Sequence, residues 1–253
     1  MILRGTSVLV TGGASGLGAA TAALLSKQGA RIAILDLDAA KGRRVAEAIG
    51  GTFCECDVAD AASAEAAIAE AAAANGPARV LATCAGIGTA ARIVGREGPM
   101  PLADFERVIR VNLVGTFNVL RLAAAAMTSL PQTDTGERGV IVTTASIAAF
   151  EGQIGQAAYA ASKGGIAAMT LPAARELARF GIRVLTIAPG LFRTPLLDGL
   201  PEDTVAGLSA AIPFPNRLGY PEEFAELVAA LVTNPYLNGE VIRLDGALRM
   251  APK

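Results

Sequence analysis

The sequence predicts one α/β domain built on a doubly wound, seven-stranded parallel sheet with helices on both faces. Short runs of β-branched and aliphatic residues alternate with longer Ala-rich helical stretches, and the short runs are apolar on both faces. The chain has 253 residues, 52% of them hydrophobic and 18% charged, enough to bury one large core. No linker, repeat or low-complexity segment divides residues 1–253, so we expect a single domain.

The elements follow in strict alternation. Strands are expected at SVLV (7–10), RIAIL (31–35), TFCEC (52–56), RVLAT (79–83), GVIVTT (139–144), IRVLTI (182–187) and EVIRL (240–244), because each run favours extended backbone. Helical patterns lie between them at 16–28, 38–49, 63–74, 104–130, 157–179 and 221–232. This order is typical of a Rossmann-type fold, in which ligands bind beyond the carboxyl ends of the strands. The long loops 86–101 and 189–217 follow strands and are expected to line the site, whereas the polar loop 131–139 is expected to be a solvated turn.

Composition excludes several function classes. The 22 basic and 23 acidic residues are spread along the chain, so no basic patch indicates nucleic acid or an anionic membrane. There is no histidine, which removes Ser-His-Asp catalysis and most catalytic zinc sites, and no metal site is expected. Cys54 and Cys56 point to the same face of an expected strand and are interpreted as buried thiols. No uninterrupted apolar run reaches the roughly 18 residues of a membrane helix, and we expect a cytoplasmic protein.

A glycine-rich turn, TGGASGLG (11–18), joins the first expected strand to the first expected helix. Glycines let a backbone approach a phosphate closely, and a helix N-terminus supplies free N–H groups. The spacing Gly12, Gly16, Gly18 differs from the commoner G-x-G-x-x-G pattern. Its strand–turn–helix context nevertheless predicts a dinucleotide site.

Two acidic residues follow the next strands. Asp36 ends the second strand, 18 residues after Gly18, where a carboxylate accepts both ribose hydroxyls and repels a 2′-phosphate. This predicts NAD rather than NADP; the alternative, an N-cap, suits Asp38 better. Asp57 and Val58 follow the third strand and are expected at an adenine ring, although a simple turn explains Asp57 equally well.

The stretch AAYAASKGG (157–165) places Tyr159 and Lys163 one helical turn apart. Without histidine, a tyrosine is a candidate base, but its ordinary pKa near 10 is too high for neutral pH. An ammonium about 4 Å away contributes on the order of 4 kcal/mol at an effective dielectric constant of 20. Lowering the pKa of the phenol by about three units takes a similar free energy, so we expect Lys163, helped by the charge of the oxidised nicotinamide, to activate Tyr159.

These motifs together resemble the short-chain dehydrogenase/reductase superfamily. The resemblance covers essentially the whole chain and rests on the turn Thr11–Gly18, Asn112 in a helix, Ser146 after the fifth strand, Tyr159 with Lys163, and the turn Pro189-Gly190. One departure is Cys84-Ala85-Gly86, where that family usually has Asn-Ala-Gly. We expect the change to weaken a structural hydrogen bond near the adenosine side without touching the hydride-transfer site.

One branch is especially similar, the type II 3-hydroxyacyl-CoA dehydrogenases, also described as hydroxysteroid dehydrogenases. The similar stretches are AAFEGQIGQAAYAASKGG (148–165), TIAPGLFRTPLL (186–197), PFPNRLG (213–219) and NGEVIRLDGALRM (238–250). The resemblance implies reversible, NAD-dependent oxidation of L-3-hydroxyacyl-CoA to 3-oxoacyl-CoA, a place in fatty-acid and lipid metabolism, and a homotetramer. Independently, the Ala-rich helices 104–130 and 157–179 are apolar over more than one face, which also indicates self-association.

The resemblance also implies roles for single residues. The catalytic residues are Ser146, which would bond the substrate oxygen, Tyr159, Lys163 and Asn112, which would hold a water linking Lys163 to solvent. The cofactor-binding residues are Gly12, Ser15, Gly16, Leu17, Gly18, Asp36, Asp57, Val58, Cys84, Gly86, Tyr159, Lys163, Pro189, Phe192 and Thr194. The substrate residues are Ser146, Gln153, Tyr159, Leu191 and Leu197, and the apolar loop 191–216 suits a lipid-like substrate.

Alternatives stay open on the same fold. They are a 3-oxoacyl reductase, against which Asp36 argues, a steroid or secondary alcohol dehydrogenase, and a non-catalytic NAD-binding regulator. Coenzyme A phosphates need cations, for which Arg92, Arg96 and Arg193 are candidates. These arginines are equally well explained as solvated loop charges.

Overall fold

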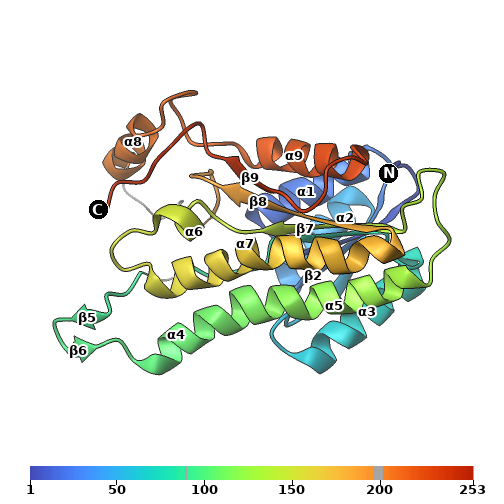
Figure 1. Cartoon of the computed structure of the whole chain (residues 1–253), viewed down its shortest axis with the longest axis horizontal. Helices are drawn as coiled ribbons and strands as arrows, with labels where there is room; N and C mark the ends of the chain where they lie inside the picture. The colour runs from blue at the N-terminus through green and yellow to red at the C-terminus, as the bar shows by residue number, and fades with distance from the viewer. Residues whose placement is uncertain (89, 196–201, 253) are drawn as a thin grey trace.

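The computed structural model describes residues 1–88, 90–195 and 202–252 and shows a sheet between two layers of helices (Figure 1). Its seven strands are parallel and lie in the order β3-β2-β1-β4-β7-β8-β9. Their bounds are β1 Ser7–Thr11, β2 Arg31–Asp36, β3 Thr52–Glu55, β4 Val80–Thr83, β7 Gly139–Thr144, β8 Ile182–Pro189 and β9 Val241–Leu244. The predicted fold class is therefore confirmed.

The helices divide between the two faces of the sheet (Figure 1). One face packs against α1 Gly16–Lys27, α2 Ala39–Ile49 and α9 Pro221–Thr233. The other packs against α3 Ala61–Asn75, α5 Gly115–Thr128 and α7 Ala157–Leu177. Along β1, Val8 and Val10 enter the first core and Leu9 the second. Because both faces are buried, the strands are continuous apolar runs rather than alternating ones.

The expected helix 104–130 is a composite. It consists of α4 Leu102–Ile109, a π-helical turn Arg110–Val114, and α5. By length and composition alone, the stretch Leu102–Thr128 could cross a membrane, but half of its most apolar window is buried inside the protein. A helix in the core of a folded domain can pass the same test of length and composition.

Several short elements were not predicted. They are the hairpin β5 Val94–Gly95 with β6 Gly98–Pro99, the one-turn helix α6 Ala148–Glu151, α8 Glu202–Ala210, and a 3₁₀ turn Ala178–Phe180. The hairpin lies in the loop 86–101 and α8 in the loop 189–217. Figure 1 shows the hairpin, α6 and α8 at the same end of the molecule. The hairpin strands, α6 and the 3₁₀ turn have only two to four residues and carry no hydrophobic period, so the sequence pattern could not reveal them. The nine-residue α8 lies in a stretch that we expected to be a loop.

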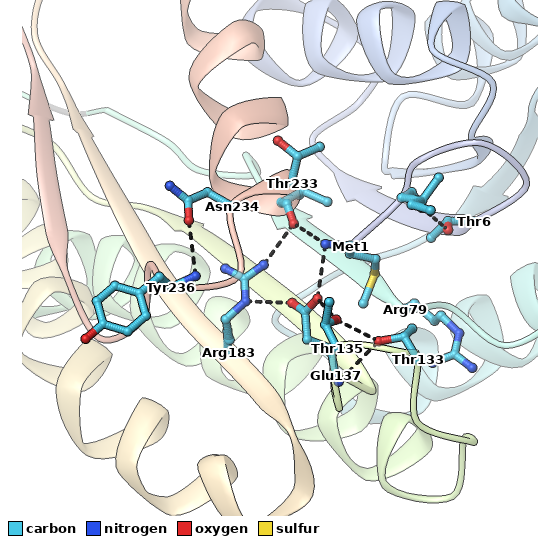
Figure 2. Close-up of polar contacts among 12 residues, drawn as sticks. Met1, Thr6, Arg79, Thr133, Thr135, Glu137, Arg183, Thr233, Asn234 and Tyr236 are labelled. Carbon is cyan, nitrogen blue, oxygen red and sulfur yellow. Dashed lines mark hydrogen bonds and ion pairs between the residues drawn. The ribbon is translucent and has the colours of Figure 1, made fainter.

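The loop 131–139 is not simply a solvated turn, because its Glu137 is buried (Figure 2). Glu137 Oε1 accepts a hydrogen bond from Arg183 Nε at 2.7 Å, and Oε2 lies 3.1 Å from the Met1 ammonium. The remaining guanidinium N–H groups of Arg183 donate to the carbonyl oxygens of Leu231, Val232 and Leu237. The prediction was wrong because the partners of Glu137 are remote in the sequence. A buried charge is tolerated when it is paired and hydrogen-bonded in this way.

Candidate active site

A cavity of about 380 Å³ lies at the carboxyl ends of β7 and β8. Its lining is mainly apolar, with a few polar groups that converge on it, as is typical of small-molecule sites. The described lining residues are Leu17, Gly88, Ala90, Ser146, Ile147, Ala148, Gln153, Gln156, Tyr159, Pro189, Gly190, Leu191, Phe192, Thr194 and Met250. Eight of these were predicted as site residues. The fold therefore brings a large part of the expected constellation to one place.

Ser146 and Tyr159 supply hydroxyl groups to the cavity wall. Ser146 lies between β7 and α6, and its Oγ accepts a hydrogen bond from Ala148 N at 3.1 Å, which fixes the side chain. Tyr159 lies in the first turn of α7. Burial raises the pKa of the Tyr159 phenol, and its hydrogen bond with Ser146 acts in the opposite direction.

Lys163 lies one turn further along α7 and is 5% exposed. Its Nζ donates to the carbonyl oxygen of Thr144 at 2.8 Å and lies 5.7 Å from the centroid of the Tyr159 ring. Burial lowers the pKa of Lys163 to about 8. Without a cofactor the pKa of Tyr159 is raised rather than lowered, because desolvation dominates there. The lowering expected from Lys163 together with the charge of an oxidised nicotinamide stays a prediction.

Asn112 lies in the π-helical turn and is fully buried. Its Oδ1 accepts from Ile87 N at 2.8 Å, while its Nδ2 donates to Ile87 O at 2.9 Å and Ser162 Oγ at 3.0 Å. A Cβ added to Gly86 would lie 3.2 Å from Asn112 Oδ1 and 3.6 Å from Lys163 Nζ. Asn112 therefore fixes the segment after β4 against α7, close to Lys163, and its water-holding role stays a prediction. A π-helical turn at a functional side chain is a recurring arrangement.

The glycine-rich turn fits a dinucleotide phosphate. Gly12 has φ +66°, and a Cβ there would lie 2.6 Å from Ala85 N, so only glycine is accommodated. A Cβ on Gly18 would lie 2.2 Å from Gly12 O, so the turn packs directly on the first turn of α1. Ser15 is the exposed N-cap of α1 and makes no side-chain capping bond. The first N–H groups of α1 have no intrahelical acceptor, which is what an anion needs.

Asp36 lies at the end of β2 and faces this turn. Its Oδ2 accepts from Ala14 N at 3.0 Å and its Oδ1 from Asp38 N at 3.0 Å. Asp38, not Asp36, is the N-cap of α2, because Asp38 Oδ1 accepts from Lys41 N at 3.0 Å. The capping alternative for Asp36 is thus excluded, and a carboxylate stands beside the phosphate turn.

Asp57 and Val58 follow β3. Asp57 Oδ1 accepts from Ala59 N at 2.9 Å. This hydrogen bond forms a simple turn, which was the alternative explanation for Asp57. Val58 is 7% exposed, and its carbonyl oxygen accepts from Asn118 Nδ2 at 2.9 Å. Both residues hold the loop after β3, and their adenine contacts stay predictions.

Cys84 lies nearer to the hydride-transfer side than expected. Thr144 Oγ1 donates to its sulfur at 4.0 Å, and the carbonyl oxygen of Thr144 is the acceptor for Lys163. Burial raises the pKa of the Cys84 thiol to about 11. The thiol is therefore neutral, and it lies beside Thr144, the residue that holds Lys163. Cys54 and Cys56 are buried free thiols, as predicted.

The remaining predicted residues have different positions relative to the cavity. Leu197 is outside the described residues. Phe192 lines the cavity but is only 6% exposed and packs edge-on against Phe224, with ring centroids 6.3 Å apart. Arg92, Arg96 and Arg193 are exposed and do not line the cavity among the described residues. Their role toward coenzyme A stays a prediction.

Several cavity residues were missed by sequence reasoning, notably Gln156, Ala90 and Met250. Gln156 directly precedes α7, and its position three residues before Tyr159 in the sequence could have identified it. Met250 is the last residue of the stretch 238–250, which resembles one branch of the family. That resemblance did not show that the stretch lies at the cavity. No local sequence signal shows that Met250 lines the same cavity as Tyr159, which lies 91 residues earlier in the chain.

The fold and this constellation define a dehydrogenase that uses a nicotinamide cofactor. The sequence pattern of the short chain dehydrogenase family matches residues 6–204. The chain belongs to this family.

Individual relatives are similar over nearly the whole chain. The 3-hydroxyacyl-CoA dehydrogenase type-2 of Homo sapiens is 52% identical over 254 residues, covering 99% of this chain and 97% of that protein. The protein of the same name from Drosophila melanogaster is 51% identical, covering 99% and 100%. A crystal structure of 3-hydroxyacyl-CoA dehydrogenase type-2 from Mycobacterium avium superposes with a TM-score of 0.93 at 47% identity, covering 98% of each chain. A (3R)-3-hydroxyacyl-CoA dehydrogenase of Homo sapiens is 35% identical, covering 98% of this chain and 97% of that protein.

Proposed function

We propose that the protein is an NAD-dependent 3-hydroxyacyl-CoA dehydrogenase that interconverts L-3-hydroxyacyl-CoA and 3-oxoacyl-CoA. The observation that carries this proposal is the wall shared by Ser146 and Tyr159 in an apolar cavity, with the buried Lys163 one helical turn away. An apolar cavity of this size suits an acyl chain. The relatives named 3-hydroxyacyl-CoA dehydrogenase type-2 support the same substrate class.

The chain's own groups supply the proton chemistry. Ser146 Oγ, held by Ala148 N, donates to the substrate oxygen at C3 and stabilises the charge that develops there. Tyr159 takes the hydroxyl proton during oxidation and returns it to the carbonyl oxygen during reduction. Lys163, fixed on Thr144 O, lies 5.7 Å from the centroid of the Tyr159 ring, where its charge favours the phenolate. A nicotinamide cofactor held by the glycine-rich turn and Asp36 would supply the hydride chemistry at C3.

The choice of NAD is proposed from Asp36. Its carboxylate lies at the end of β2 with one oxygen on Ala14 N, beside the phosphate turn. A fixed negative charge there favours two ribose hydroxyls and repels a 2′-phosphate. Lys41, in the first turn of α2, is paired with Asp38 at 2.8 Å.

Initial rates with acetoacetyl-CoA, measured with NADH and with NADPH, test the proposal. We expect rapid oxidation of NADH and a much lower kcat/KM with NADPH. A preference for NADPH would indicate a 3-oxoacyl reductase, and activity only on steroids or simple ketones would indicate another dehydrogenase. Tight NADH binding without turnover of any of these would indicate a regulator. Oxidation of the two enantiomers of 3-hydroxybutyryl-CoA tests the proposed L configuration.

A homotetramer is proposed from the helical face formed by α4, α5 and α7. Leu102, Val114, Phe117 and Leu171 on this face are large apolar side chains that are 44–68% exposed. Such a patch is typical of a surface that is covered in an assembly. The mass of one chain is 25.6 kDa. Light scattering at micromolar concentration is expected to give four times this mass, and the mass of a monomer would contradict the proposal. The cytoplasmic location stays a proposal that cell fractionation tests.

A further inference from the structure

The chain end after β9, residues 245–252, is here called the C-terminal strap. Met250 of the strap lines the cavity together with Leu191. Leu248 is 2% exposed and packs in a small core with Ile147, which also lines the cavity. Figure 1 shows this chain end beside α6, at the end of the sheet that carries the site. The strap is therefore part of the substrate wall and not a loose terminus.

Glu151, the last residue of α6, joins the strap to the site. Its Oε2 accepts from Met250 N at 3.0 Å and from Arg243 Nη2 at 3.2 Å. Its Oε1 accepts from Arg243 Nη1 at 2.8 Å, and Arg249 Nε lies 3.3 Å from the same oxygen. The Glu151 carboxylate thus holds the backbone of Met250, and the Arg243 guanidinium fixes that carboxylate through two hydrogen bonds. Such paired geometry restricts orientation as well as distance.

Arg243 also fixes the strap directly. It lies in β9, and its Nε donates to Asp245 Oδ2 at 2.7 Å while its Nη2 donates to Leu248 O at 2.9 Å. Asp245 is itself largely buried, with a side chain 8% exposed. Arg243 and Glu151 form an ion pair in which each side chain is 23% exposed.

Two further hydrogen bonds hold the strap to the segment before α7. Gln153 Nε2 donates to Ala251 O at 3.0 Å, and Ile154 N donates to Pro252 O at 3.0 Å. Gln153 lines the cavity as well. The strap is therefore fixed on both sides of Met250.

We propose that Met250 sets the length of acyl chain that the cavity accepts, and that Glu151 is the positioning residue that holds Met250 in the wall. This inference rests on the proposed function and names the feature that limits its substrate. An unbranched thioether side chain adapts to an apolar ligand, but its backbone must be held for it to act as a limit. The Glu151 carboxylate supplies that hold.

The test compares kcat/KM for acetoacetyl-CoA and 3-oxodecanoyl-CoA in wild type, Met250→Ala, Glu151→Gln and the control Glu65→Gln. Glu65 is an exposed carboxylate on α3, 3.6 Å from Arg121, and is not among the cavity residues. Each methylene newly accommodated in apolar surroundings is expected to improve kcat/KM by up to about fourfold. We expect the ratio of the long to the short substrate to rise at least several-fold in Met250→Ala and in Glu151→Gln, and to stay unchanged in Glu65→Gln.

The outcomes separate the inference from the proposed function. An unchanged ratio in Met250→Ala, with wild type active on acetoacetyl-CoA, would overturn the role of Met250. A lowered Tm with an unchanged ratio in Glu151→Gln would show that Glu151 only stabilises the fold. Hydrogen exchange of the peptide containing residues 246–252 needs no substrate and tests the hold itself. We expect faster exchange in Glu151→Gln than in Glu65→Gln, and equal rates would overturn the positioning role even if no acyl-CoA were turned over.

Discussion

The pH dependence of reduction follows from the burial of Lys163. Its pKa is lowered from an ordinary value of 10.5 to about 8, a shift that corresponds to roughly 3 kcal/mol against the charged form. The ammonium is therefore present below pH 8 and lost above it, whereas Tyr159, whose pKa is raised, stays protonated as the acid. Reduction needs both protonated groups, so kcat/KM for NADH should fall about tenfold per pH unit above pH 8.

The assay measures kcat/KM for NADH between pH 6 and 10, from initial rates at limiting NADH and a fixed, non-saturating acetoacetyl-CoA concentration, because kcat/KM reports groups of the free enzyme. Lys163→Arg is the discriminating variant, since a guanidinium is not deprotonated in this range. We expect its rate to be lower but its falling limb to move above pH 10. A wild-type profile that is flat from pH 7 to 9.5 would refute the reasoning.

Three further predictions concern charged residues. Asp36→Ala should raise KM for NAD and weaken the bias against NADP, so an unchanged NAD/NADP ratio of kcat/KM would exclude the ribose contact. Glu137→Gln should lower the free energy of unfolding by about 3 kcal/mol, because it leaves buried Arg183 without its carboxylate. Burial opposes ionisation of Glu137, but bonds from Thr135, Arg183 and the Met1 ammonium lower its pKa. Its contribution is therefore complete above the ordinary pKa of 4.5 and lost as the pH falls through the lower folded value, so the variant's Tm should depend less on acid pH. Replacing Arg92, Arg96 and Arg193 together by Ala should raise KM for acetoacetyl-CoA but not for a ketone without phosphates; equal effects would leave no support for a clamp.

The sequence predicted the sheet well, because strands such as β7 are buried on both faces and the apolar run marks their bounds directly. It also predicted that Ser146 and Tyr159 share a site, since fixed motifs follow particular strands. The pKa of Tyr159 could not be predicted, because an ion pair can be inferred from spacing but the competing desolvation depends on the packed structure.

Long-range polar pairing was equally hidden. Glu137 and Arg183 are 46 residues apart, and Glu151 and Met250 are 99 apart. Neither pair leaves a local pattern, so the polar loop around Glu137 had the same appearance as a solvated one. The π-helical turn at Asn112 was missed because an inserted residue hardly changes the hydrophobic period of a long helix.

The central claim, that Tyr159 exchanges the proton while hydride moves at C3, is tested most directly by Tyr159→Phe. NADH binding, followed by fluorescence, should be retained, because the substitution removes only one oxygen from the cavity wall. Under single-turnover conditions with acetoacetyl-CoA, we expect NADH oxidation to slow by about a hundredfold to ten-thousandfold. Oxidation at the wild-type rate by a variant that binds NADH normally would contradict the account.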